Sequence, residues 1–413
     1  MGNPALQCNL LEVEDGGNFV FRTTPIMPNK QHILFANGHL NVGGVERSLV
    51  DVLKHLDYSK YDVDLLLLED LGTYHNEIPK QVNVIYKDTR KTYGAFFTTC
   101  IHNIKTRNWF GLGYRFAMLA TKLNLAIGYR LARRLLGLRK YYDAAIAYRV
   151  GICANIITHG VKSPNKHCWW HHGAIRSSDN LSQLTYFNQI IAVSHGVKKM
   201  LSQAAPTLTD KLSVVPNMVD VEQICAMGND GGNPYSNYDG LKFVTVGRIV
   251  VEKHIENVVN AAVRLRADGR LNFKWFVIGD GELYDDIAQR IQEAQIEDCV
   301  ILCGRKPNPY PYIKHADMMV HTSHIESQGL VIQEAMALGT PCVVTRSVGP
   351  SEFIIDGENG VMVEPNVESL IEGIYRLATD KKLQNKIIVN GYKSLHDYNP
   401  EVVINKINIL INI

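Results

Sequence analysis

Two acids separated by seven residues mark the part of this chain best suited to chemistry. Glu326 and Glu334 flank Gly329-Leu330, and the sequence around them predicts a buried strand, a polar loop and a helix that begins near Gly329. Carboxylates accept strong charge-assisted hydrogen bonds from hydroxyl groups, and the free N–H groups of a helix start favour an anion. A surface loop acid and a helix-face acid would look the same, so this pair alone leaves both interpretations open.

Two basic side chains and two glycines on other predicted elements could contact a bound anion. Arg248 and Lys253 flank a turn that follows a predicted strand, where fixed cations would stabilise charge on a departing diphosphate. Gly43 and Gly44 end a polar loop between an earlier strand and helix, and glycines let a backbone approach a phosphate closely. An ordinary tight turn explains this glycine pair equally well when it is read alone.

Strands and helices alternate along the chain in two series, separated by a loop-rich tract at residues 228–240. At 413 residues the chain is too long for one ordinary core, and its apolar fraction of 46% supports large cores. Alternating strands and helices indicate parallel sheets with helices on both faces. We therefore predict an α/β fold with two doubly wound, Rossmann-like domains that face a cleft.

Five motifs in a fixed order resemble those of retaining glycosyltransferases of family 4, which have the GT-B fold. They are Gly43-Gly44, His172-Gly173, Gly247-Arg248 with Lys253, Gly279-Asp280-Gly281 and Glu326-x7-Glu334. His172 matches the strand-end histidine of the family best, with His171 as the alternative. The lysine of the family is usually followed by a glycine, which is His254 here.

The resemblance implies transfer of a sugar from a UDP- or GDP-sugar with retention of anomeric configuration. Arg248 and Lys253 would stabilise the leaving diphosphate, and Glu334 would hold the ribose. Because the donor is itself a substrate, no further cofactor is expected. The Gly43-Gly44 turn would lie beside the donor phosphates.

The resemblance also assigns the remaining contacts of the donor. Glu326 would fix the donor sugar together with the amides of Gly329 and Leu330. His172 would assist at the sugar from the opposite domain. The loop that contains Arg305 would lie along the base.

The same resemblance gives the predicted order of the domains. Residues 1–29 are expected to be a poorly structured lead-in. Residues 30–220 would form the acceptor-side domain and residues 221–395 the domain that binds the nucleotide sugar. Residues 396–413 would form a C-terminal helix that returns to the first domain.

A metal site is not expected. Asp62-Val-Asp64 has the Asp-x-Asp pattern that binds metal in the other large glycosyltransferase fold, but here it opens a strand and no polar loop surrounds it. A motif match outside its expected context is only a weak hypothesis. We therefore predict that the reaction needs no metal ion.

A basic tract without acids runs from Thr89 to Tyr142. It contains eleven Lys or Arg residues and no Asp or Glu, and large apolar residues alternate with them. This pattern favours helices on an anionic membrane surface over a solvated basic face. No recognition motif supports nucleic acid as the partner. Combined with the family resemblance, the tract predicts a lipid-linked saccharide acceptor of a bacterial-type surface polysaccharide.

The expected location is the cytoplasm, on the inner face of the cell membrane. The sequence has no uncharged apolar run of membrane-spanning length, and residues 1–29 lack the pattern of a secretory signal. Its eight cysteines show no CxxC or zinc pattern, which favours a reduced compartment. Two other functions keep the same fold: a sugar-nucleotide epimerase and a non-catalytic subunit of a transferase.

Overall fold

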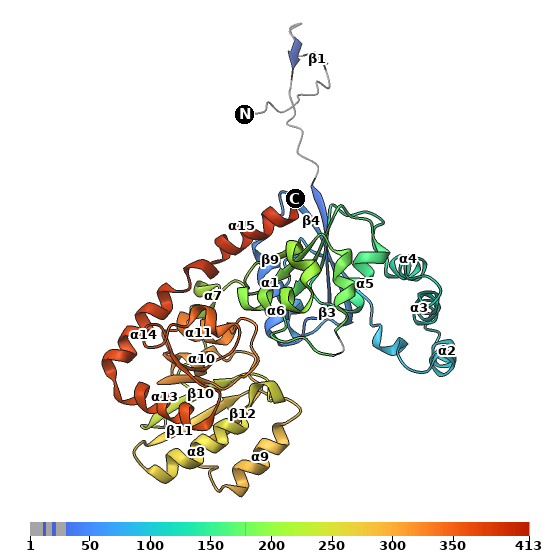
Figure 1. Cartoon of the computed structure of the whole chain (residues 1–413). Coiled ribbons are helices and arrows are strands. Elements are labelled where there is room, and N and C mark those ends of the chain that lie inside the picture. Colours follow the sequence, from blue (N-terminus) through green and yellow to red (C-terminus); the bar gives the residue numbers. More distant parts are fainter. Residues whose placement is uncertain (1–10, 14–18, 22–29, 178, 413) are drawn as a thin grey trace.

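A computed structural model describes residues 11–13, 19–21, 30–177 and 179–412 (Figure 1). Within the first 29 residues it describes only two short strands, β1 (Leu11–Val13) and β2 (Phe19–Phe21), which pair antiparallel. The rest of the predicted lead-in at residues 1–29 lies outside the described residues.

The first domain is built on a seven-stranded parallel sheet with the order β5-β4-β3-β6-β7-β8-β9. The central runs of its longer strands, Ile33–Ala36 and Leu65–Leu68, are apolar and completely buried, as expected for a parallel sheet with helices on both faces. The chain leaves β3 toward one edge of the sheet and returns at β6 toward the other. The strands are β3 (Gln31–His39), β4 (Tyr61–Asp70), β5 (Asn83–Tyr86), β6 (Ala144–Ala147), β7 (Asn165–Trp170), β8 (Gln189–Ala192) and β9 (Leu212–Val214).

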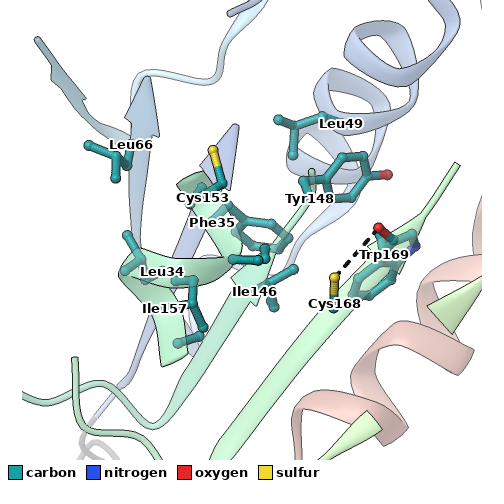
Figure 2. Close-up of a cluster of buried hydrophobic side chains, with 14 of the residues drawn as sticks. Leu34, Phe35, Leu49, Leu66, Ile146, Tyr148, Cys153, Ile157, Cys168 and Trp169 are labelled. Atoms are coloured by element: carbon teal, nitrogen blue, oxygen red, sulfur yellow. Dashed lines mark hydrogen bonds between the residues drawn. The ribbon is translucent and has the colours of Figure 1, made fainter. Parts of the chain in front are cut away.

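Helices cover both faces of this sheet and close its core. Figure 2 shows part of that core, where Phe35 and Ile146 from neighbouring strands pack near Leu49 and Tyr148. These side chains are almost completely buried, and each contributes roughly 1.5–3 kcal/mol of transfer free energy. The covering helices and turns are α1 (Gly44–His55), η1 (Thr73–Glu77), η2 (Arg90–Thr92), α5 (Ile152–Asn155), the π-helical turn η3 (Ile156–Gly160), η4 (Leu181–Tyr186), α6 (His195–Ala204) and η5 (Pro206–Lys211).

The basic tract forms three consecutive helices, which project from the side of the first domain in Figure 1. They are α2 (Phe96–Lys105), α3 (Trp109–Ala120) and α4 (Leu125–Leu136). Asn108 and Asn124 cap the starts of α3 and α4 by accepting hydrogen bonds from backbone N–H groups, and Gly137 ends α4 in the left-handed conformation. No helix in the described part of the chain is long and apolar enough to cross a membrane.

The second domain has a six-stranded parallel sheet with the order β12-β11-β10-β13-β14-β15. The strands are β10 (Leu241–Val246), β11 (Phe273–Ile278), β12 (Val300–Gly304), β13 (Met318–His321), β14 (Cys342–Thr345) and β15 (Val361–Val363). The helices are α7 (Val221–Gly228), η6 (Val251–Lys253), α8 (Glu256–Asp268), α9 (Tyr284–Glu293), α10 (Tyr310–Lys314), α11 (Leu330–Ala337), α12 (Pro350–Phe353), α13 (Val367–Thr379), α14 (Lys381–Lys393) and η7 (His396–Tyr398).

The last helix, α15 (Pro400–Ile411), returns to the first domain. Its apolar side chains join the first domain's core, namely Val403, Ile407, Leu410 and Ile411. The Asn165 amide also donates to the Ile411 carbonyl at 3.2 Å. The predicted fold, two doubly wound parallel-sheet domains with a returning C-terminal helix, is therefore confirmed.

Candidate active site at the domain interface

The candidate residues of the second domain gather where its strand order reverses. Arg248 and Lys253 follow β10, while Glu326 and Gly329 follow β13, and these two strands are neighbours in the sheet. Ligands of doubly wound sheets bind beyond the carboxyl ends of the strands at such a switch point. The fold thus places the two cations and the first acid of the Glu-x7-Glu pair at one edge.

Lys253 and Glu326 form an ion pair at the centre of this edge. The Lys253 Nζ lies 2.5 Å from Glu326 Oε2, and His321 Nε2 lies 3.4 Å from the same oxygen. Burial alone would raise the pKa of Glu326, but Lys253 and His321 more than offset it and hold the pKa well below its ordinary value. Glu326 is therefore ionised. Its partner His321 was not predicted, although a histidine closing an otherwise apolar strand is a usable signal.

Gly329 allows α11 to begin where it does. Its φ is +89°, and an added Cβ would lie 2.9 Å from Ile332 Cδ1, so a larger residue would be strained. Gly44 faces the start of α11 from the first domain, because a Cβ there would lie 3.5 Å from Leu330 Cδ1. The Gly43-Gly44 turn is thus brought opposite Gly329 and Leu330.

The His172-Gly173 loop also reaches the second domain. A Cβ on Gly173 would lie 2.8 Å from the carbonyl carbon of Glu326, so the two backbones are in close contact. Burial lowers the pKa of His172, and Arg176 and Arg248 add to that effect, Arg248 from across the domain boundary. His172 is therefore within electrostatic range of Arg248 in the second domain, and its lowered pKa favours the neutral ring.

His171 lies on the other side of the same loop. Its ring is 4.8 Å from the ring of Tyr148 in the first domain, and burial lowers its pKa to about 3. Its Nε2 is enclosed and has no hydrogen-bond partner among the described residues. The two histidines therefore occupy different places, His172 toward the second domain and His171 against the first.

His254 takes the backbone conformation that a glycine would favour at this position. Its φ is +48°, which is uncommon for a residue with a side chain. The ring stacks on His324 with centroids 3.5 Å apart, and its Nδ1 lies 2.8 Å from Glu256 Oε1. These contacts stabilise the turn after Lys253 without a glycine.

Glu334 faces the hinge between the domains. Its Oε1 accepts a hydrogen bond of 3.1 Å from the Tyr310 hydroxyl, and Arg47 and Asp51 of α1 stand across from it. Burial raises the pKa of Glu334 to about 7, although Tyr310 and Arg47 partly oppose the change. A small cavity lies between these groups, next to Leu330. Tyr310 and Arg47 were not predicted, since nothing in their spacing links them to Glu334.

Other predicted residues lie at the margin of the site. Arg248 is exposed, and its guanidinium forms no ion pair with an acid within residues 30–177 and 179–412. Arg305 is 57% exposed, with its nearest acid, Asp280, 4.0 Å away. Gly279 allows two backbone segments to pack closely, because a Cβ at this position would lie only 1.8 Å from the Gly247 carbonyl oxygen.

The two acids of Asp62-Val-Asp64 are engaged by neighbouring side chains. Asp62 pairs with Arg139 at 3.0 Å, and Asp64 accepts hydrogen bonds from Tyr142 at 2.7 Å and from Asn83 at 2.8 Å. In the part of the chain that the structure describes, no three His, Cys, Asp or Glu side chains are arranged to hold a metal ion. A reaction without metal stays a prediction.

A buried chain of hydrogen bonds joins the domains behind the site. Ser48 contacts Tyr148 at 2.8 Å and donates to Asn217 at 2.6 Å. The Asn217 backbone then exchanges two hydrogen bonds with the Gln328 amide, at 2.7 and 2.9 Å. Gln328 also donates to Gln333 of α11 at 2.8 Å. Sequence reasoning missed this chain because its members are far apart in the sequence.

Residues 235–394 match the protein family described as "Glycosyl transferases group 1". A lipopolysaccharide core biosynthesis glycosyltransferase of Rhizobium meliloti is 27% identical over 224 residues, which cover 53% of this chain and 63% of that protein. An Escherichia coli protein named UDP-Gal:alpha-D-GlcNAc-diphosphoundecaprenol alpha-1,3-galactosyltransferase is 30% identical over 217 residues, 48% of this chain and 56% of its own length. The chain thus spans less than two thirds of the length of these relatives.

Two solved structures resemble almost the whole chain. A mutant of S. aureus TarM, in complex with fondaparinux, alpha-GlcNAc-glycerol and UDP, has a TM-score of 0.68 at 15% identity and covers 93% of this chain and 100% of its own. Anabaena Alr3699/HepE in complex with UDP and glucose has a TM-score of 0.69 at 16% identity, with 92% and 99% covered. At these identities the likeness shows a shared fold.

Proposed function

We propose that this chain, which carries a glycosyltransferase group 1 domain, transfers a sugar from a nucleotide-diphosphate sugar to a lipid-linked saccharide in surface polysaccharide biosynthesis. The observation that carries the proposal is the Lys253–Glu326 ion pair at the switch point of the second sheet, where Arg248 follows the same strand as Lys253. Such cations would bind a diphosphate, and an ionised carboxylate would accept hydrogen bonds from the hydroxyls of a sugar.

Each role is proposed for a side chain at this edge or at its margin. Lys253 and Arg248 stabilise the leaving diphosphate, which takes the place of Glu326 beside the lysine ammonium. Glu326, once released, accepts hydrogen bonds from hydroxyls of the donor sugar. Glu334 binds the ribose, and Arg305 lies toward the base.

The reaction is proposed to retain anomeric configuration. The bond between the sugar's anomeric carbon and the diphosphate oxygen breaks, and a bond from that carbon to the acceptor oxygen forms on the same face. The acceptor proton passes to the leaving diphosphate. His172 contacts the sugar from the first domain, and its lowered pKa keeps the ring neutral beside the cationic groups.

The test of this function is a screen of the purified chain against UDP- and GDP-sugars, with thermal shift and donor hydrolysis as readouts. We expect one nucleotide sugar to stabilise the protein and to be hydrolysed slowly, with release of the nucleoside diphosphate. An acceptor product with free diphosphate excludes an epimerase. No binding of any nucleotide sugar would contradict the proposal.

Helices α2, α3 and α4 support attachment to a membrane. Each carries exposed apolar side chains at helical spacing, and the connecting turn adds Leu123, which is 91% exposed. The exposed large apolar residues are Phe97, Ile101 and Ile104 on α2, Trp109, Phe116 and Leu119 on α3, and Leu125, Ile127, Leu131 and Leu135 on α4. Apolar stripes beside Lys and Arg suit the interface of an anionic bilayer.

Not all basic residues of the tract are available for lipid headgroups. Arg139 pairs with Asp62, and Arg133 donates to the Leu138 carbonyl at 2.9 Å. Arg130, Arg134 and Lys140 are exposed. These three residues are the basic positions to change.

We expect the triple change of Arg130, Arg134 and Lys140 to Gln to weaken binding to anionic liposomes at least tenfold, because each basic residue contributes on the order of 1 kcal/mol at low salt. Co-sedimentation at low and high salt measures it. The matched control changes exposed lysines on α6 and α14, Lys199, Lys382 and Lys393, to Gln. A parent protein that ignores anionic liposomes at low salt and prefers a soluble acceptor would overturn the membrane assignment.

A further inference from the structure

Two histidines stack between the segments that carry Lys253 and Glu326. The rings of His254 and His324 lie with their centroids 3.5 Å apart and their planes inclined by 19°. His254 directly follows Lys253 in the chain, and His324 lies two residues before Glu326. The stack therefore joins the turn and the loop whose charges are proposed above to bind the donor.

The same two segments also touch through their backbones. The Thr322 hydroxyl donates to the Lys253 carbonyl at 2.8 Å, and the His324 N–H donates to the Glu252 carbonyl at 3.2 Å. The Lys253 ammonium lies 2.5 Å from Glu326. Because the rings stand among these contacts, a change in the distance between the rings would also change the distance between Lys253 and Glu326.

His254 is the ring of the stack that has an acid as its partner. Its Nδ1 lies 2.8 Å from Glu256 Oε1, so this nitrogen carries a hydrogen, and a positive ring would face a carboxylate. Glu252, in the same turn, pairs instead with Arg176 of the first domain at 2.8 Å. Glu256 is therefore the acid that balances charge on the stack.

His324 has no such partner. Its Nε2 is enclosed and has no hydrogen-bond partner among the described residues. A charged ring carries a hydrogen on both nitrogens, so protonation would leave an enclosed N–H without an acceptor. Burial lowers the pKa of His324, and the neighbouring His254 lowers it further, while Glu256 partly opposes the change. His324 is therefore the ring that favours the neutral form.

Acid should separate the two rings. Two positive rings at 3.5 Å repel each other, and Glu256 balances only one of them. Because the pKa of His324 is lowered in the folded protein, the contribution of its neutral form to stability is present above the ordinary value of 6.5 and is lost as the pH falls through the lowered pKa. Glu326 stays ionised in this range, because its own pKa is held well below its ordinary value.

We propose that the His254–His324 stack positions the Lys253 turn against the Glu326 loop, and that protonation of both rings loosens this arrangement and weakens binding of the donor diphosphate. The proposal rests on the transferase function stated above. It makes His324 a positioning residue, which acts through Lys253 and Glu326. It also gives a function to His254, which stands where the glycosyltransferases that this chain resembles usually have a glycine.

The test measures the affinity for UDP-glucose and GDP-mannose at pH 8 and pH 5.5 by isothermal titration calorimetry. The diphosphate of a nucleotide sugar keeps its charge over this range, so a change in affinity arises in the protein. His324→Phe keeps an aromatic ring in the stack but cannot be protonated. We expect the parent to lose about fivefold more affinity than this variant on acidification. Other titrating groups, such as Glu334 and His172, are the same in both proteins.

Two further variants sharpen this comparison. His396→Phe is the matched control, since His396 is 85% exposed and contacts Asp397, and it should lose as much affinity as the parent. His324→Ala removes the ring and should bind the nucleotide sugar about tenfold more weakly even at pH 8. Equal losses for the parent and His324→Phe, or parent-like affinity of His324→Ala at pH 8, would overturn the positioning role.

A second measurement separates this proposal from the transferase function. NMR of the ring Cε1–H signals follows the titration of His324 without nucleotide, in the parent and in His254→Gly, where glycine suits the backbone φ of +48°. Removal of the neighbouring ring should raise the midpoint of His324, and an unchanged midpoint would overturn the coupling of the rings. If no nucleotide sugar binds at any pH, the transferase function is contradicted, and the midpoint alone decides whether the rings are coupled.

Discussion

The strand order reverses once in each sheet, between β10 and β13 in the second domain and between β3 and β6 in the first, but the polar groups at these two switch points are paired differently. In the second domain, Lys253 already holds an ionised carboxylate, Glu326, at 2.5 Å. In the first domain, the guanidinium of Arg149, which follows β6, donates to the imidazole of His39 at the end of β3, at 3.0 Å. The edge of the second sheet, proposed above to bind the donor, thus holds an internal ion pair, which the diphosphate would replace under the proposed function. At the first sheet's edge the contact is a hydrogen bond to a histidine ring. Substitutions at the two edges should therefore differ in which property they change and by how much.

The largest effect is expected from the donor edge. Arg248→Ala and Lys253→Ala should each lower the transfer rate about a hundredfold, the loss typical of removing one fixed charge-stabilising group. Steady-state rates at saturating donor measure this. The matched control is Arg264→Ala on α8, an exposed arginine that pairs with Glu368 away from the site. Rates within twofold of the parent, with the fold intact, would rule out the diphosphate role.

A smaller, pH-dependent effect should separate the two acids of the Glu-x7-Glu pair. The pKa of Glu334 is raised from 4.5 to about 7, so its contribution to stability is present below pH 4.5 and is lost as the pH rises through 7. Glu334→Gln, which stays neutral, should therefore raise the free energy of unfolding relative to the parent at pH 8 by roughly 1–3 kcal/mol, because each pKa unit corresponds to about 1.4 kcal/mol, and should change it little at pH 4.

Glu326 should show the opposite sign. Its pKa is lowered, so its contribution is present above its ordinary value of 4.5 and is lost as the pH falls through the lowered pKa. Glu326→Gln should destabilise the protein at pH 7, because Lys253 loses its ionised partner. Thermal unfolding of both variants between pH 4 and 8 tests the pair. Parallel pH profiles for the two variants would contradict the contrast.

The smallest effect is expected from metal removal. With cations supplied by Arg248 and Lys253, we expect EDTA to leave the transfer rate within about twofold of its starting value. The assay uses metal-free buffer, with manganese or magnesium added back afterwards. A large loss restored by either ion would show that the donor edge needs a metal as well as its side chains.

Local pattern was sufficient to predict the two sheets and the presence of Lys253 and Glu326 at the switch point of the second sheet. The alternation of apolar strands with helices predicts the sheets. Residues that follow a strand closely, such as Glu326 and Gly329, must lie at its carboxyl end. The predicted helix start near Gly329 differs by one residue from α11, which begins at Leu330. The Gly279-Asp280-Gly281 motif was identified, but its first glycine serves close packing against Gly247.

Contacts between distant elements could not be predicted in this way. The contact of Tyr310 with Glu334 and the Gln328–Asn217 pair join segments whose separation in the sequence has no fixed period. Burial also raises the pKa of Glu334, and that burial depends on the assembled domains. The sequence likewise predicted the basic tract but not that Arg139 would be paired with Asp62.

Helix α15 has a consequence for the order in which the protein can mature during translation. Residues 400–411 complete the hydrophobic core of the first domain, yet the ribosome makes them after the entire second domain. Until α15 is synthesised, the first domain therefore exposes part of its apolar core, while the second domain is already being made and can fold. The half of the molecule that emerges first is the half that is finished last.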